Sequence, residues 1–326
     1  MSTFFGGRFT TTLMSRSKSQ PKPDPRPRYS VSARDSARPH SAPPTVSGRW
    51  LFAAVAIVIP AAAFCAWAAL CLLFWQGSWQ LLYHPSAAVT RTPASIGLAF
   101  DSVGFATADT GTPRLKGWWI PSDPSAHYTV LYLHRQNGNL GDTLDNLANL
   151  HNAGVNVLAF DYRGYGQSQF VHPSEARWRQ DVEWALQYLT ATRHVDPRTI
   201  VLDGSDLGAN LALEIAASHP ELAGVVVESP LDAPINTIFG DPRAHLVPAH
   251  LLVSDRFDLD APAAALRIPS LWFLPEPPRG QSESTESSRA FQRINAKKLW
   301  IWLTPSSQSH ETISNALSRW LDDLHK

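Results

Sequence analysis

The sequence predicts an α/β protein with a mostly parallel sheet covered by helices on both faces and by a small cap, preceded by one transmembrane helix. Three observations lead to this prediction. Short apolar runs alternate with segments of helical periodicity through most of the chain. Runs such as residues 155–160 are almost wholly apolar, which is typical of strands buried on both faces. An uncharged segment of 25 residues, 51–75, precedes them all.

The N-terminal tail, residues 1–49, is basic and poor in aliphatic side chains. It holds nine basic and two acidic residues, a net charge of +7, whereas the whole chain is neutral. A Ser-, Pro- and Arg-rich segment buries too little apolar surface to offset its ordering entropy, so we expect a disordered tail. The rest of the chain therefore carries −7, and nucleic acid is not an expected partner.

The apolar segment predicts a transmembrane helix over residues 50–76. About 20 apolar residues span a bilayer, and Pro60 is tolerated in such a helix. Trp75, Trp79 and Tyr83 would form an aromatic belt at the far interface. A cleaved signal peptide is the alternative, although run and tail are both long for one. Because basic segments stay inside, we expect a cytoplasmic N-terminus and an extracytoplasmic domain.

Cysteine and histidine usage narrows the possible chemistry. The two cysteines, Cys65 and Cys71, both lie in the apolar run, so the globular part has neither a disulfide nor a thiol nucleophile. The histidines are scattered, and no H-E-x-x-H pattern is present. We therefore expect no metal and no cofactor, and a small molecule as substrate. Nothing in the sequence indicates an oligomeric state.

One large domain, residues 80–326, follows the helix, and its size of roughly 240 residues suits a single α/β domain. A small cap is expected over about 230–268. The expected strands are residues 98–104, 117–120, 128–134, 155–161, 199–203, 224–228, 270–274 and 298–303. The expected helices are about 140–152, 174–192, 207–218, 285–294 and 310–324. In such sheets, ligand sites lie at the carboxyl ends of the strands.

The segment after the strand 199–203 has the pattern of a nucleophile elbow. A strand runs directly into a helix, and glycines flank one residue, as in the turn G-x-nucleophile-x-G. The residues two before and two after the tip must be small. Asp206 meets this requirement with Gly204 and Gly208, whereas a tip at Ser205 would place the bulky Leu207 too close. Asp206 therefore occupies the nucleophile position.

Three roles are open to an aspartate at this position. As a nucleophile it attacks carbon and forms an ester with the enzyme, which a histidine-activated water then hydrolyses. As a base, Asp206 activates water directly and forms no covalent intermediate. As a structural residue it caps the following helix, since Asp is a preferred N-cap and negative charge is favoured there.

Five motifs follow one another along the chain: Tyr83-His-Pro, Gly117-Trp-Trp-Ile-Pro, Leu131-Tyr-Leu-His-Arg-Gln-Asn-Gly-Asn, Asp161-Tyr-Arg-Gly-Tyr-Gly-Gln-Ser and Asp206-Leu-Gly-Ala-Asn. Together they resemble the bud-emergence-type, serine-aminopeptidase-like branch of the α/β hydrolases. The resemblance covers about residue 80 to the C-terminus and implies the α/β-hydrolase fold. Members of this branch often carry an N-terminal membrane span.

Three departures from the family pattern fall at functional positions. Asp206 replaces the serine of Gly-x-Ser-x-Gly, and Arg135 replaces the glycine of His-Gly. By the resemblance, the oxyanion hole consists of the backbone N–H groups of Gln136 and Leu207, which any non-proline residue supplies. The family's acid follows the strand 270–274, but here that slot falls near Pro278.

The resemblance also indicates the histidine and a replacement acid. His310 follows the last expected strand, where the family has its catalytic histidine. Asp232 is the first choice of acid, because some haloalkane dehalogenases, which also use an elbow aspartate, take their acid from the corresponding strand end. Glu276 is the second choice, and a helix N-cap is the structural alternative for Asp232. His134 and Asp161, which end adjacent strands, are expected to be structural.

The sequence thus predicts a membrane-anchored hydrolase of a small ester-like or alkyl substrate, with Asp206 as nucleophile and His310 as base. The alternative is a catalytically inactive binding or scaffold protein on the same fold, because a fold alone does not confer function. The three departures at functional positions are the reason for considering this alternative.

Overall fold

The computed structural model describes residues 47–123, 125–276, 285–303 and 310–324, although not the side chains of residues 310–312. The chain divides into two compact units, Met1–Ala56 and Ile57–Lys326, with the boundary inside the first helix. Most of the expected tail, residues 1–49, therefore lies outside the described part of the chain.

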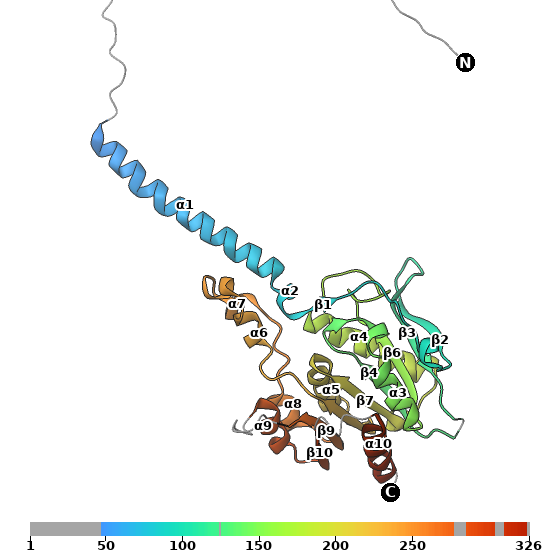
Figure 1. Cartoon of the computed structure of the whole chain (residues 1–326). Coiled ribbons are helices and arrows are strands. Elements are labelled where there is room, and N and C mark those ends of the chain that lie inside the picture. Colours follow the sequence, from blue (N-terminus) through green and yellow to red (C-terminus); the bar gives the residue numbers. More distant parts are fainter. Residues whose placement is uncertain (1–46, 124, 277–284, 304–309, 325–326) are drawn as a thin grey trace, which may run out of the picture. The chain divides into compact units, whose positions relative to one another are not determined.

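An eight-stranded sheet forms the centre of the second unit (Figure 1). β3 pairs antiparallel with β2 and β6, and all other pairs are parallel. In spatial order the strands are β10 (Lys298–Leu303), β9 (Ser270–Pro275), β8 (Gly224–Glu228), β7 (Ile200–Ser205), β4 (Thr129–Leu133), β6 (Asn156–Asp161), β3 (Pro113–Ile120) and β2 (Asp101–Thr107). A separate two-stranded pair joins β1 (His84–Pro85) to β5 (Asn137–Gly138).

Helices cover both faces of the sheet, because alternate side chains of the strands enter two apolar clusters. Leu131 and Leu133 of β4 belong to one cluster, and Val130 and Tyr132 to the other. The first cluster includes side chains of α4 (Glu175–Gln187), α5 (Leu207–Ser218), α8 (Asp260–Ala265) and α9 (Glu286–Arg293). The second includes side chains of α3 (Leu144–Asn152) and α10 (His310–Leu324), which lie side by side (Figure 1).

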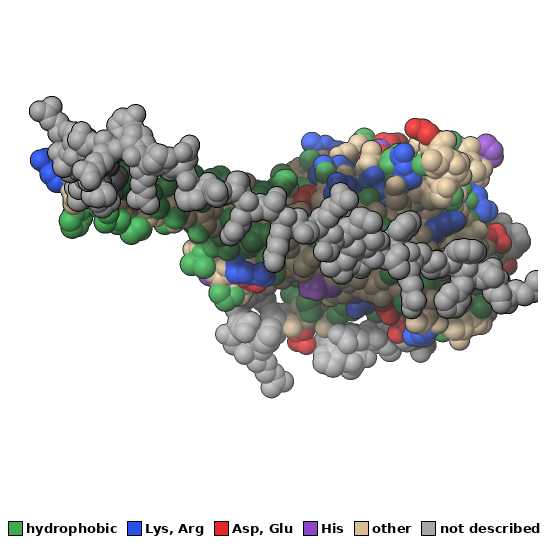
Figure 2. Space-filling view, turned by 90° about the horizontal axis from the view of Figure 1, so that it is seen from above, with side chains coloured by type: hydrophobic (Ala, Val, Ile, Leu, Met, Phe, Trp, Pro, Cys, Tyr) green, Lys and Arg blue, Asp and Glu red, His purple; other side chains and the backbone are tan. Residues whose placement is uncertain are grey.

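The helix α1, Gly48–Gly77, is long and apolar enough to cross a membrane, and it is almost wholly exposed. Hydrophobic side chains run along its described length (Figure 2). It is followed by the short α2, Trp79–Leu82. The expected span over residues 50–76 thus corresponds to one continuous helix that contains Pro60.

All eight expected strands and all five expected helices are present, which confirms the predicted α/β architecture. β2 begins at Asp101 and not at residue 98, because Leu98 and Phe100 pack on the second cluster after a turn at Gly97. The expected cap segment contains α6 (Ile235–Phe239), α7 (Ala249–Leu252) and α8. The remaining short turns are η1 (Pro93–Ile96), η2 (Leu140–Asp142), the π-helical η3 (Tyr188–Thr192), η4 (Pro197–Thr199) and η5 (Pro242–His245).

Candidate active site

The turn between β7 and α5 holds Asp206 in a strained backbone conformation. Its φ of +52° and ψ of −119° lie in a region that non-glycine residues rarely adopt. The neighbouring backbones are in close contact, since a Cβ on Gly204 would lie 2.2 Å from Gly208 O and one on Gly208 would lie 2.3 Å from Leu133 O. Ser205 is the last residue of β7 and pairs with Glu228 of β8. Asp206 is therefore the residue at the tip.

A cavity of about 390 Å³ opens at this turn, and three carboxyl groups and the guanidinium of Arg135 line it. The carboxyl groups belong to Asp206, Glu228 and Asp145, of which Asp145 is exposed. Ser229 also lines the cavity and has a φ of +47°. Two strained non-glycine residues thus face one cavity, and backbone strain of this kind is concentrated at functional sites.

Burial and charge set the ionisation of these groups. Burial raises the pKa of Asp206, and the Arg135 guanidinium opposes that rise. Burial also raises the pKa of Glu228 to about 7, with the Asp206 carboxylate adding to the rise, whereas a hydrogen bond from Asn146 Nδ2 at 2.8 Å and the charge of Arg135 oppose it. Near neutral pH, a proton can therefore reside on Glu228.

Gln136 and Leu207, whose backbone N–H groups are the two expected oxyanion donors, are hydrogen-bonded to each other. The backbone oxygen of Gln136 accepts hydrogen bonds from the His84 N–H at 3.0 Å and from the Tyr165 hydroxyl at 2.8 Å. Its side-chain Oε1 accepts one from the Leu207 N–H at 3.2 Å. The Leu207 donor is therefore occupied by a side chain of the same protein.

The other expected site residues are placed less directly. Asp232 is exposed, and its Oδ1 accepts hydrogen bonds from the Ser287 N–H at 2.7 Å and the Ser287 hydroxyl at 2.5 Å, which ties this loop to the first turn of α9. Glu276 is exposed just after β9. His310 is the first residue of α10, but its side chain, like the acid slot near Pro278, lies outside the described residues. Leu303 and Ile313, on either side of His310 along the chain, both line the cavity.

His134 and Asp161 form a buried pair at the ends of β4 and β6. The His134 Nδ1–H donates to Arg135 O at 2.7 Å, and Nε2 lies 3.7 Å from Asp161 Oδ1. Burial lowers the pKa of His134 to about 4 and raises the pKa of Asp161 to about 7. Asp161 Oδ1 also accepts a hydrogen bond from the Leu140 N–H at 2.9 Å. These contacts support the structural role expected for both residues.

Sequence reasoning did not identify Glu228 and Asn146 as site residues. Glu228 ends β8 and Asn146 lies in the first turn of α3, 82 positions apart, and their hydrogen bond depends on the assembled sheet and helix. The one available signal was the rule that strand ends carry ligand sites, which applies to Glu228. Within the described ranges, no group of three or more His, Cys, Asp or Glu side chains could hold a metal ion.

The sequence is similar to known proteins over about half its length. Residues 124–270 match the model of the family described as serine aminopeptidase, S33. An uncharacterised protein of Mycobacterium tuberculosis is 33% identical over 162 residues, which cover 49% of this chain and 56% of that protein. Mouse alpha/beta hydrolase domain-containing protein 17C is 31% identical over 131 residues, 40% of either chain. The chain thus spans about half the length, or less, of these relatives.

Solved structures show the same fold. An esterase from Pyrococcus furiosus superposes with a TM-score of 0.58 at 18% identity, covering 75% of this chain and 98% of the esterase. The α/β hydrolase GrgF from a Penicillium species gives a TM-score of 0.51 at 18% identity, covering 70% of this chain and 98% of that chain. The chain has the α/β-hydrolase fold, as the sequence predicted.

Proposed function

We propose that this protein is a membrane-anchored hydrolase that uses Asp206 as a nucleophile on a small ester-like or alkyl substrate. The observation that carries the proposal is the position of Asp206, at the tip of a strained turn that opens into a cavity of about 390 Å³. This position supports the interpretation of the turn as a nucleophile elbow. The family match and the fold support a hydrolase in general terms.

The proposed reaction has two steps. An Asp206 carboxylate oxygen attacks the alkyl carbon, and the leaving group departs with the bonding electron pair, so that an ester of Asp206 forms. Water then attacks the carbonyl carbon of that ester, and the tetrahedral oxyanion accepts hydrogen bonds from the Gln136 and Leu207 N–H groups. Collapse releases the alcohol and leaves one oxygen of the water in the Asp206 carboxylate. Arg135 favours the first step, because it opposes the rise in the pKa of Asp206.

The base for the second step is His310, which lies between two residues of the cavity wall along the chain. Asp232 and Glu276 remain candidates for its acid partner. Glu228 is a third candidate, and we favour it because it lines the cavity, whereas Asp232 accepts two hydrogen bonds from Ser287. The Glu228 carboxyl group also suits proton exchange near neutral pH, since its pKa is raised to about 7.

The anchor is part of the same proposal. The length and composition of α1 support a membrane span over residues 50–76. The basic tail, residues 1–49, favours a cytoplasmic N-terminus, which places residues 80–326 on the extracytoplasmic side.

The experiment combines a substrate screen with oxygen-18 labelling. A panel of small alkyl esters, epoxides and haloalkanes is tested with the full chain in detergent, alongside Asp206→Ala and His310→Ala. For any compound that only the wild type turns over, a single turnover in labelled water should place oxygen-18 in the peptide containing Asp206. Turnover without label, and without a covalent adduct in the intact-protein mass, would instead support Asp206 as a base for water.

The second candidate function is a binding protein without catalysis. The observation in its favour is the hydrogen bond from the Leu207 N–H to Gln136 Oε1, which occupies an oxyanion donor. On this view the cavity binds a small molecule that is not converted. Binding of panel compounds without any turnover, abolished by Asp206→Ala, would support it over the hydrolase.

A further inference from the structure

Large hydrophobic side chains outside α1 are exposed at few places in the described part of the chain. Four residues form this set: Phe170 at 83% exposure, Leu246 at 62%, Leu251 at 86% and Leu299 at 48%. Leu299 lies in the edge strand β10, whereas the other three belong to loops and to α7. Isolated exposed leucines are common, but several at one end of a molecule indicate a surface that contacts another apolar phase.

Leu246 and the helix that carries Leu251 lie against the C-terminal half of α1. The Trp67 indole N–H donates to Leu246 O at 3.1 Å. The segment around α6 and α7 forms a small apolar cluster with Phe74, against which Leu70 and Cys71 also pack. The loop that carries Leu246 thus lies beside α1 at the level of Trp67.

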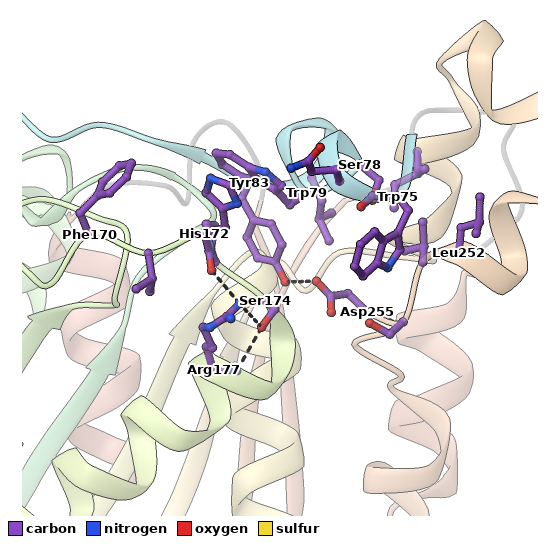
Figure 3. A pocket seen from close by; sticks show the side chains of 17 residues that line it. Trp75, Ser78, Trp79, Tyr83, Phe170, His172, Ser174, Arg177, Leu252 and Asp255 are labelled. Carbon is purple, nitrogen blue, oxygen red and sulfur yellow. Dashed lines mark hydrogen bonds between the residues drawn. The ribbon is translucent and has the colours of Figure 1, made fainter. Parts of the chain in front are cut away.

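Phe170 and the residue after Leu251 line one cavity at the end of α1. This cavity, of about 590 Å³, is distinct from the one at Asp206 and is also lined by Trp75, Trp79 and Tyr83. In Figure 3, Phe170 and Leu252 lie on opposite sides of it. Phe170 and Leu252, the neighbour of Leu251, therefore line this cavity at the point where α1 ends.

The wall of this cavity changes from aromatic to polar. Trp79 stacks on His172 with ring centroids 4.6 Å apart, and the Tyr83 hydroxyl donates to Asp255 Oδ2 at 2.6 Å (Figure 3). Arg177 lines the same cavity and is exposed. Aromatic rings beside hydrogen-bonded polar groups are typical of the membrane–water interface, where one part of each ring is apolar and the other hydrated.

We propose that Phe170, Leu246 and Leu251 form a second membrane-contacting surface, which inserts through the interfacial layer into the outer acyl-chain region of the bilayer that α1 spans. This inference rests on the proposed membrane insertion of α1. With a rise of 1.5 Å per residue, Trp67 lies about 12 Å along the helix from Trp75, so a loop bonded to Trp67 reaches past the aromatic belt. The partner is phospholipid, because Leu246 and α7 lie directly beside the apolar, exposed helix α1.

The surface has a consequence for the larger cavity. Because Phe170 and Leu252 stand at its rim, insertion of the neighbouring Leu251 places its mouth against the lipid headgroups and not in bulk water. The apolar wall then takes acyl chain and the polar wall takes headgroup. The segment 235–254 thus holds the domain at a fixed orientation on the membrane.

Site-specific fluorescence in vesicles tests the proposal. The full chain, with Cys65→Ala and Cys71→Ala, is reconstituted into mixed phosphatidylcholine and phosphatidylglycerol vesicles. It carries a single environment-sensitive label at Leu251→Cys or Phe170→Cys. Leu299→Cys is the matched exposed control on the domain, and Val58→Cys reports on α1. We expect the labels at 251 and 170 to have blue-shifted emission. Lipids that carry a doxyl group high on the acyl chain should quench these two labels severalfold more than the label at 299.

The outcomes separate this surface from the anchor itself. In one outcome, lipid quenches the label at 58, but aqueous iodide quenches the labels at 251 and 170 as strongly as the label at 299. This result overturns the proposed surface and leaves the anchor intact. An aqueous label at 58 overturns the anchor, and with it this inference. Leu251→Ser should lower the fraction of label at 170 accessible to lipid quenchers, whereas Leu299→Ser should leave that fraction unchanged.

Discussion

The side-chain Oε1 of Gln136 accepts a hydrogen bond from the Leu207 N–H at 3.2 Å, so one residue supplies an expected oxyanion donor and occupies the other. The backbone oxygen of Gln136 accepts two further hydrogen bonds, and these fix the position of the backbone that carries the side chain. A reacting oxyanion must displace this amide oxygen before it can bind the Leu207 N–H. The hydrogen bond thus opposes the second step of the proposed reaction.

Removing that amide should accelerate hydrolysis of the enzyme ester. A neutral hydrogen bond contributes about 1 kcal/mol, so we expect Gln136→Ala to speed the decay of an Asp206 ester by about fivefold. The measurement is the time course of adduct loss in the intact-protein mass after a pulse of an epoxide. Gln136→Glu is the matched control and should slow the decay, because a carboxylate accepts the bond more strongly. Equal decay rates in all three proteins would contradict this role of Gln136.

Arg135 should set the pH at which Asp206 becomes nucleophilic. Its charge opposes the rise in the pKa values of both Asp206 and Glu228. In Arg135→Gln both pKa values therefore rise, and since only the carboxylate attacks carbon, labelling of Asp206 should require higher pH. The measurement is the rate of alkylation of Asp206 by an epoxide across pH, read by peptide mapping. Arg135→Lys retains the charge and should retain the wild-type profile, whereas identical profiles for both variants would argue against this electrostatic role.

The sequence predicted the sheet because its strands follow local patterns, and the proposed tip residue also rests on a local pattern. No knowledge of tertiary contacts is needed to recognise the apolar runs of the strands or the spacing of Gly204 and Gly208 around Asp206. The resulting strand-to-helix turn is present, with Asp206 at its tip. The secondary structure of the segment 230–268 was harder to predict, because α6, α7 and α8 are short and pack on elements distant in the sequence.

The hydrogen-bond and cavity partners of the site residues could not be predicted from the sequence, because the partners lie far apart along the chain. Asp232 precedes α6 and resembles a cap, yet its carboxylate bonds to Ser287, 55 positions later. Glu228 enters the cavity because β8 lies next to β7 in the sheet. Which strand end faces which helix is a property of the assembled sheet.

Gly208 should be indispensable for folding of the domain. A Cβ at this position would lie 2.3 Å from Leu133 O and 2.6 Å from His134 O, and backbone cannot move away cheaply. We expect Gly208→Ala to lower the free energy of unfolding by roughly 3 kcal/mol or more. The control is Gly77→Ala, because nothing lies within 4 Å of a Cβ there. Chemical denaturation followed by tryptophan fluorescence gives both values, and a near-neutral Gly208→Ala would refute the close approach.

His134 and Asp161 should contribute to stability with opposite dependence on pH. Burial lowers the pKa of His134 to about 4, so the unfolded chain gains a proton below about pH 6.5 that the folded chain does not, and stability falls toward pH 4. Burial raises the pKa of Asp161 to about 7, so the folded chain keeps a proton that the unfolded chain loses above about pH 4, and stability falls toward pH 7. Between pH 4 and 6.5 the two contributions therefore largely cancel.

Asp161→Asn and His134→Gln should separate the two contributions. Because many other groups titrate, the useful quantity is the difference in free energy of unfolding between wild type and variant, measured with urea at several pH values. The advantage of wild type over Asp161→Asn should be roughly 4 kcal/mol larger at pH 4 than at pH 7.5. For His134→Gln the trend reverses, and the wild-type advantage should shrink by roughly 3 kcal/mol as the pH falls from 6.5 to 4. Differences that stay constant with pH would show that neither group is held in the neutral form by burial.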